Sequence, residues 1–246
     1  ESVIKDIDSK KYLLPSIQRE FVWSTGQIEK LFDSLMRDYP INAFLLWKVP
    51  REKVSEFKFY EFLRDYHQKD NKHNPKANTN GTEDIIAILD GQQRMTSLYI
   101  ALKGTYAYKM SYKRWDNPAA YPKRKLYLNL LAASDDADMF YDFLFLTEEE
   151  AKNIKNDNDE YEGAFWFPVG KILDFREESD VNDYLIDNDL NTVADKAQAK
   201  FANKALFKLY SVIHNKQTIS YYLEESTELD KVLNIFIRVN SGGTTL

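Results

Sequence analysis

Five consecutive residues combine side chains that could bind a phosphate group: Asp90, Gly91, Gln92, Gln93 and Arg94. Arg94 offers a planar fork of donors suited to phosphate oxygens, and Gln92 and Gln93 could hydrogen-bond a ribose, a base or an attacking water. Asp90 could hold a magnesium ion that bridges phosphates, because such ions take one or two carboxylates and keep several waters. The structural alternative is an ordinary Asp-Gly turn followed by an arginine in a salt bridge.

The flanking sequence predicts a strand, a tight turn and a helix around these residues. Residues 85–89 form a short aliphatic run, which is typical of a buried strand. Met95, Leu98 and Leu102 then recur at the spacing of one helical face, and Gly104 supplies a stop. The first N–H groups of such a helix are free, so this corner should attract anions, phosphate above all.

The sequence before this corner predicts three further elements. Pro15 favours an extended segment at 13–17, and a capping box of Ser24 and Gln27 begins a helix at 25–37. Residues 43–49 then read as a buried strand. Aromatic residues follow Gln18 and Arg19 and include Phe21 and Trp23. They could stack on a base, although an aromatic residue beside a strand is more often part of the core.

The rest of the chain predicts a loop, then a mainly helical part. After Phe57 the aromatic residues give way to a polar tract at 67–84, which we interpret as a loop; it contains His67 and His73, interpreted as solvated rather than as metal ligands. Acidic residues dominate 134–160 and indicate an exposed face. A helix is expected around 201–212, a strand at 218–223, and a last helix that runs into 238–243.

Composition limits the class of protein. The chain has 246 residues, 43% of them hydrophobic, and no cysteine, which excludes disulfides and Cys-based zinc sites. No signal peptide or apolar span of membrane length is present, so a cytoplasmic protein without a membrane partner is expected. The net charge of -6 argues against nucleic-acid binding by the whole surface but allows a local basic patch. We interpret the chain as a fragment of a longer protein.

Three separated motifs carry a family resemblance. LPSIQREFVW with the following DYPINAFLLW, then ILDGQQRMTSL, then IFIRVNSGGTTL, resemble the N-terminal domain family of GmrSD-type restriction endonucleases, also called domain of unknown function 262. The resemblance spans nearly the whole chain. It implies an α+β fold with a small mixed sheet of the ParB/sulfiredoxin type, in which a strand, a turn with an arginine and a helix bind nucleotide phosphate.

The resemblance also implies site residues and a division of the chain. Residues 90–94 would form the nucleotide site with Mg²⁺, Gln18 and Arg19 would line the same cleft, and Asn240 and Gly243 would match the third motif. Residues 1–133 would form the α/β nucleotide-binding part, and 134–246 a mainly helical part that closes the cleft and brings Asn240 towards Arg94. A helix C-terminus with a glycine cap is the structural alternative for the third motif.

Three functions compete at this stage. The first is a nucleotide-binding, nucleotide-hydrolysing regulatory domain of a bacterial modification-dependent restriction or phage-defence protein. The second is a ParB-like nuclease, although no cluster of acids with a His or Lys accompanies Asp90. The third is a module that binds DNA, modified or not, without nucleotide turnover. In this family a separate C-terminal nuclease domain often does the cutting, and we interpret His214 as a surface residue. The fragment alone is therefore not expected to cut DNA.

Overall fold

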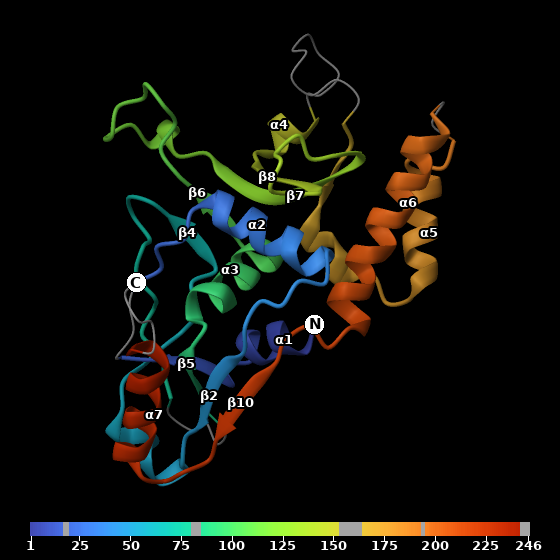
Figure 1. Ribbon diagram of the computed structural model, residues 1–246. Coiled ribbons are helices and arrows are strands. Elements are labelled where there is room, and N and C mark those ends of the chain that lie inside the picture. The colour runs from blue at the N-terminus through green and yellow to red at the C-terminus, as the bar shows by residue number, and fades with distance from the viewer. Residues whose placement is uncertain (17–19, 80–84, 153–163, 193–194, 242–246) are drawn as a thin grey trace.

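The computed structural model describes residues 1–16, 20–79, 85–152, 164–192 and 195–241. Its described part is a mixed α/β structure built on two five-stranded mixed sheets (Figure 1). The first has the order β10-β2-β5-β1-β3, and the path of the second is β4-β6-β7-β8 with β9 also paired to β7. The coarse expectation of an α+β fold is therefore confirmed.

The first sheet contains the predicted phosphate corner. Its strands are β1 (Tyr12–Pro15), β2 (Phe44–Lys48), β3 (Phe59–Tyr60), β5 (Ile86–Asp90) and β10 (Tyr221–Glu224). The central strand β5 runs parallel to β1 and antiparallel to β2, and β10 joins the sheet parallel to β2. Among the described residues, the last strand in sequence thus completes a sheet whose other four strands come from the first 90 residues.

The second sheet combines strands from the middle of the chain. They are β4 (Asp65–His67), β6 (Thr105–Ala107), β7 (Lys123–Ala133), β8 (Tyr141–Leu146) and β9 (Trp166–Pro168). The 11-residue β7 pairs with three neighbours, and its central residues are buried.

Helices fill the space between the sheets and cover their outer faces. They are α1 (Ser2–Asp8), α2 (Thr25–Met36), α3 (Gln92–Lys103), α4 (Glu148–Lys152), α5 (Glu178–Asp187), α6 (Lys196–Tyr210) and α7 (Leu229–Ser241). Short 3₁₀ helices lie at η1 (Arg51–Glu56), η2 (Pro118–Ala120) and η5 (Val169–Asp174), and a π-helical turn, η6 (Ser211–Asn215), follows α6.

Two apolar clusters occupy the two faces of the first sheet. The larger contains buried residues of α2, α3, α6 and the second sheet, and α2 and α3 lie between the two sheets in Figure 1. The smaller lies on the opposite face, where Val232 of α7 meets Leu89, Leu45 and Trp47. Alternate residues of β5 supply each face, since Ile88 joins the large cluster while Ala87 and Leu89 join the small one.

Most predicted elements are present, with shifts of a few residues at their ends. The capping box of Ser24 and Gln27 begins α2 as predicted, and Gly104 is the C-cap of α3. The expectation of an aromatic core is confirmed for Tyr12 and Phe21, which are buried, while Trp23 is half-buried and packs against the large cluster.

One of two predictions was confirmed and the other was wrong. The polar tract 67–84 was expected to be a loop, and beyond β4 its described residues form only turns, a bend and isolated bridges. The acidic segment 134–160 was expected to be an exposed face, yet it contains β8, whose Phe143 and Phe145 are buried. In β8 the apolar residues 143–146 occupy only four positions of the 27-residue segment, so the abundance of acids around them hides them. Because β8, β9 and β10 lie beyond residue 133, the later half of the chain is helical only in part.

Candidate functional site

The turn between β5 and α3 depends on Gly91. This residue is the N-cap of α3 and has a left-handed backbone, with φ 87° and ψ 13°. A Cβ atom at Gly91 would lie 2.4 Å from Cδ1 of Phe44 and 3.0 Å from Nη2 of Arg94. Glycine is therefore required here both for its backbone conformation and for the space it leaves.

Arg94 holds the neighbouring chain segment against this turn. Its Nη1 donates to the carbonyl oxygens of Ile41 and of Asn42, the second at 2.9 Å, and its Nη2 donates to that of Ala43 at 3.2 Å. Its Nη2 also lies 3.3 Å from Oδ2 of Asp90, and the guanidinium covers the ring of Phe44 at 4.5 Å. Arg94 thus joins the DGQQR motif to the INAF residues of the preceding motif.

The environment of Arg94 differs from that of an ordinary arginine on a helix surface, because its side chain is only 15% exposed. Burial lowers the pKa of Arg94, and the charge of Asp90 acts in the opposite direction. In this arrangement the N–H groups of Arg94 donate to backbone carbonyl oxygens and to one carboxylate, although these groups were expected to bind a phosphate. The guanidinium is therefore a positioning group in this structure.

Gln93 connects the turn to the first motif. Its amide oxygen accepts a hydrogen bond from the backbone N–H of Val22 at 2.9 Å, and its amide nitrogen donates to the carbonyl oxygen of Glu20 at 2.9 Å. Gln92 is buried instead, and its Nε2 donates to the carbonyl oxygen of Ile88 at 3.2 Å. The two amides therefore hold their neighbours in place from opposite sides of the helix start.

The groups that remain available for an anion belong to the backbone. Gln92, Gln93 and Arg94 are the first three residues of the 12-residue α3, so their N–H groups have no carbonyl partner within the helix. Asp90 lies beside them, and its Oδ1 has no hydrogen-bond partner in the part of the chain that the structure describes. One free carboxylate oxygen fits a magnesium ion whose other ligands are waters and phosphates.

The remaining predicted site residues cannot be placed in the same way. Gln18, Arg19 and Gly243 lie outside the described residues. Asn240 belongs to α7, but its side chain is also outside the description. The structure brings 90–94 together with 20–22 and 41–43, and it packs α7 against β5 through the smaller apolar cluster.

Sequence reasoning missed two carboxylates on α2, of which one is buried and one half-buried. Asp33, 3% exposed, accepts hydrogen bonds from the N–H groups of Phe140 at 2.9 Å and of Tyr141 at 2.8 Å. Glu29, one turn earlier, accepts from the N–H of Phe145 at 3.1 Å. Both carboxylates therefore satisfy the free edge of β8. Their i, i+4 spacing was a signal, because they interrupt the apolar face of the helix.

Glu29 should make the stability of the protein depend on pH. Burial raises the pKa of Glu29 to about 7, and the N–H of Phe145 lowers it in part. The folded state then binds a proton more tightly than the unfolded state, so the free energy of unfolding falls as pH rises from about 4.5 to 7. Glu29→Gln should remove this loss, raising stability at pH 8 by up to about 3 kcal/mol.

Urea unfolding of wild type and Glu29→Gln between pH 4.5 and pH 8 checks this prediction. Glu52→Gln, at an exposed position of η1, is the matched control and should leave the pH dependence unchanged. Parallel stability curves for wild type and Glu29→Gln would contradict the assigned role of burial.

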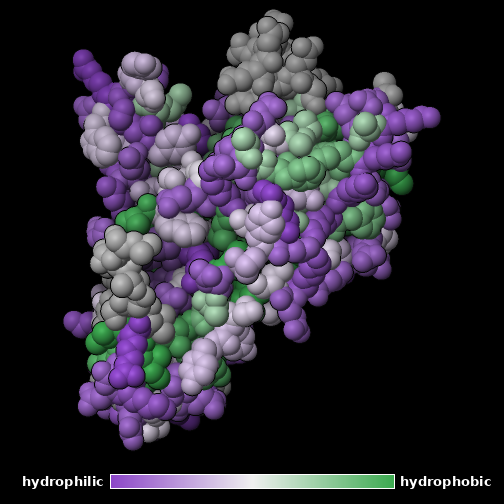
Figure 2. Space-filling model, in the orientation of Figure 1, coloured by the Kyte–Doolittle hydropathy of each residue, from purple (hydrophilic) through white to green (hydrophobic). Residues whose placement is uncertain are grey.

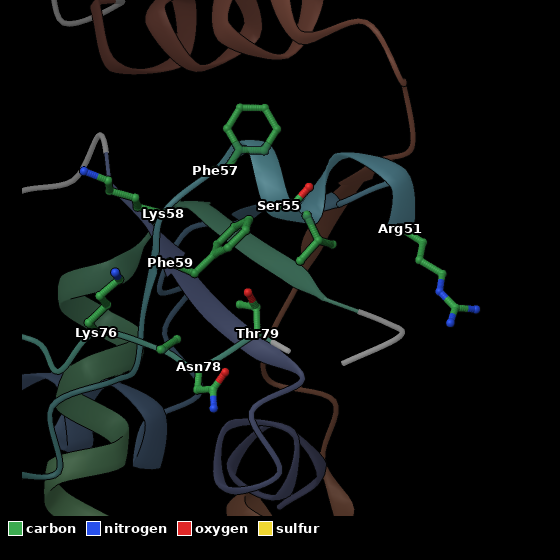
Figure 3. Close-up of a pocket in the computed structure, with 10 residues that line it drawn as sticks. Arg51, Ser55, Phe57, Lys58, Phe59, Lys76, Asn78 and Thr79 are labelled. Atoms are coloured by element: carbon green, nitrogen blue, oxygen red, sulfur yellow. The ribbon is translucent and has the colours of Figure 1, made fainter. Parts of the chain in front are cut away.

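A pocket of about 630 Å³ lies elsewhere, beside η1 and β3. Figure 3 shows Phe59 pointing into it, with Lys58 and Lys76 on one side and Arg51 directed away. The pocket borders the smaller apolar cluster through Val54. Its described lining includes none of the residues predicted for the phosphate site, so this pocket and the predicted chemistry lie in different places.

The histidines differ from expectation at two positions. His73 is exposed as expected and contacts Glu20 at 2.8 Å, but the His67 side chain is only 23% exposed and accepts hydrogen bonds from backbone N–H groups. His214 was expected on the surface, yet its side chain is 8% exposed. It contacts Glu1 and the carbonyl oxygen of Ile172 at 3.1 and 2.8 Å. Among the described residues, no three His, Asp or Glu side chains are grouped so as to hold a metal ion.

The fold and the turn define a mixed α/β domain in which segments 20–22 and 41–43 of the first motif meet the second motif at the start of α3. The complete chain, residues 1–246, matches the GmrSD restriction endonuclease N-terminal domain, and the chain belongs to this family. An uncharacterised protein of Methanocaldococcus jannaschii is 33% identical over 100 residues, which are 41% of this chain and 16% of that protein. The match thus covers less than a fifth of the relative's length. No helix within the described ranges has the length and apolarity to span a membrane.

Proposed function

We propose that this domain binds a nucleoside triphosphate at the start of α3 and hydrolyses it. This activity would regulate a restriction endonuclease that acts on modified DNA. The observation that carries the proposal is the group of N–H donors at 92–94, which have no carbonyl partner within α3, beside Oδ1 of Asp90, which no described residue contacts by a hydrogen bond. Helix N-termini bind phosphate through such donors. Family membership supports the connection to restriction, and the ParB-like character of the fold rests on the motif resemblance.

Each residue of the motif has a distinct proposed role. The backbone of 92–94 would bind phosphate oxygens, and Asp90 would hold Mg²⁺, which neutralises phosphate charge when bound. Gln93 and Arg94 position the segments 20–22 and 41–43 around the nucleotide. Gln18, Arg19, Asn240 and Gly243 complete the cleft by resemblance alone. A nuclease domain or subunit would cut the DNA.

Calorimetric titration with ATP, GTP and CTP tests this proposal. Wild type should bind one of them only with Mg²⁺ present. Asp90→Asn, which removes the charge that attracts the ion but keeps the side-chain shape, should weaken binding at least about tenfold, corresponding to about 1.4 kcal/mol. Asp187→Asn changes an exposed carboxylate at the end of α5 and should bind as wild type does.

Two results would overturn the proposal. One is no binding of any triphosphate by wild type at millimolar concentration, and the other is equal affinity in wild type and Asp90→Asn. Tight binding without phosphate release would keep the site but replace hydrolysis by a sensing role.

A further inference from the structure

We propose that the loop between β6 and β7, residues 108–122, together with the start of β7, binds a nucleic-acid strand whose bases are accessible. Figure 1 shows this green loop projecting away from both sheets. Residues 108–125 contain six Lys or Arg and one Asp, a net charge of +5 on a chain whose total is -6. This segment is thus strongly basic although the protein as a whole is acidic.

The cations at this corner face solvent. Lys113, Arg114, Lys123 and Lys125 are exposed, and none forms a salt bridge with any residue that the structure describes. Arg124 is different because it is 5% exposed and packs over the ring of Tyr108 at 4.1 Å. Four of the six cations are therefore available to an anionic partner, while Arg124 supports the base of the loop.

Large apolar side chains are exposed among these cations. Tyr112 is fully exposed, Trp115 is 50% exposed, and Tyr108 and Met110 are each 36% exposed. Tyr112 also has a left-handed backbone, with φ 63°, which a bulky residue rarely adopts. The fold thus exposes the Tyr112 ring to solvent although its backbone conformation is strained. Strained backbone conformations of this kind cluster at functional sites.

The loop is braced rather than loose. The N–H of Met110 donates to the carbonyl oxygen of Ala120 at 2.7 Å, and the hydroxyl of Tyr121 donates to that of Trp115 at 3.0 Å. Lys109 Nζ donates to the carbonyl oxygens of Met110 and Lys113 at 3.0 and 2.9 Å. The ring of Tyr121 contacts Trp115 edge-on at 5.8 Å. The exposed groups are therefore presented in a fixed arrangement, which lowers the entropy lost on binding.

These features match a nucleic-acid strand better than other partners. Lysine and arginine neutralise phosphates along the backbone, and exposed aromatic rings stack on unpaired bases of any sequence. The alternation of cations and rings in one loop supplies both contacts at once. The choice of nucleic acid over another acidic partner rests in part on the proposed role in restriction, and the surface is separate from the residues of the nucleotide site.

Fluorescence anisotropy with a labelled DNA strand of about 20 nucleotides, which exceeds the site of a typical single-strand-binding fold, tests this surface. Binding is measured without nucleotide and with EDTA, so that it can succeed or fail independently of triphosphate binding. Tyr112→Ala and Trp115→Ala should each weaken single-strand binding about fivefold or more, and duplex binding much less.

The charged residues have a different signature. Lys113→Ala/Arg114→Ala should weaken binding of strand and duplex, and should reduce the slope of log affinity against log salt by about 1.4 for the strand. The matched controls are Lys200→Ala/Lys204→Ala, which removes two exposed lysines of α6, and Tyr221→Ala, which removes an exposed ring of β10. Both should bind as wild type does. Thermal unfolding should show all variants folded, because every altered side chain is exposed.

Three outcomes would overturn the inference. They are no single-strand binding by wild type, equal binding by the loop variants and the controls, and binding to vesicles of anionic lipid without binding to DNA. The last result would assign the loop to a membrane surface.

Discussion

Arg94→Ala should lower the free energy of unfolding by about 2–4 kcal/mol, the cost of removing a buried charged donor from several acceptors. The carbonyl oxygens of 41–43 would lose their shared partner, and Asp90 would lose its counter-charge. Arg94→Lys should recover only part of this loss, because an ammonium keeps the charge but not the planar fork. Chemical denaturation monitored by tryptophan fluorescence measures both variants.

Arg114→Ala is the control for Arg94→Ala, because it removes an arginine that is exposed in the β6–β7 loop. Its effect should stay within about 0.5 kcal/mol. If Arg94→Ala were equally harmless, the contacts of the guanidinium would not be needed for stability. Its role would then be the one that the motif first indicated, which is binding a phosphate. Weak nucleotide binding by Arg94→Ala is informative only after this measurement, since a displaced 41–43 segment would also impair the site.

Gly91→Ala should destabilise the domain by about 2–4 kcal/mol, because two separate penalties add. Alanine is strained at φ 87°, and its Cβ would lie 2.4 Å from the buried Phe44 ring, which requires repacking that typically costs 1–3 kcal/mol. Denaturant unfolding measures the loss. Adding Phe44→Leu should relieve the overlap but not the strain, so the double variant should be more stable than the two single losses predict.

Gly26→Ala provides the matched control for Gly91→Ala. Gly26 lies in the first turn of α2, and a Cβ there would meet nothing closer than 3.9 Å. This substitution should be neutral or stabilising by up to about 1 kcal/mol, since alanine favours the helix. A loss at Gly91 no larger than at Gly26 would show that the turn can rearrange, and the tight connection between β5 and α3 would not be needed for folding.

The strand, turn and helix around residues 85–104 could be predicted because each depends on local pattern. The aliphatic run, the glycine and the helical spacing all lie within 20 residues, and β5 and α3 form there. The same holds for α2, whose capping box is contained in four residues. Local chemistry of this kind is visible in a single sequence.

The partners of the site could not be predicted because they come from distant parts of the chain. Arg94 meets carbonyl oxygens more than 50 positions away, and backbone oxygens leave no mark in a sequence. His214 is buried because it meets Ile172 and Glu1, at separations of 42 and 213 residues. Burial by tertiary contact therefore overturned the expectation that His214 lies on the surface.

The parallel pairing of β10 with β2 has a consequence for how the protein is made. Strand β2 pairs with β5 along one edge and with β10 along the other. Until Tyr221–Glu224 has been synthesised, the second edge has no partner strand in the first sheet. Helix α7 covers the face of that sheet that carries the smaller apolar cluster, and it is synthesised after β10. A chain emerging from the ribosome therefore carries an open strand edge and uncovered apolar surface for most of its synthesis, and both promote aggregation. Nascent chains should need protection, and truncation before residue 221 should yield insoluble protein even though the complete phosphate motif is present.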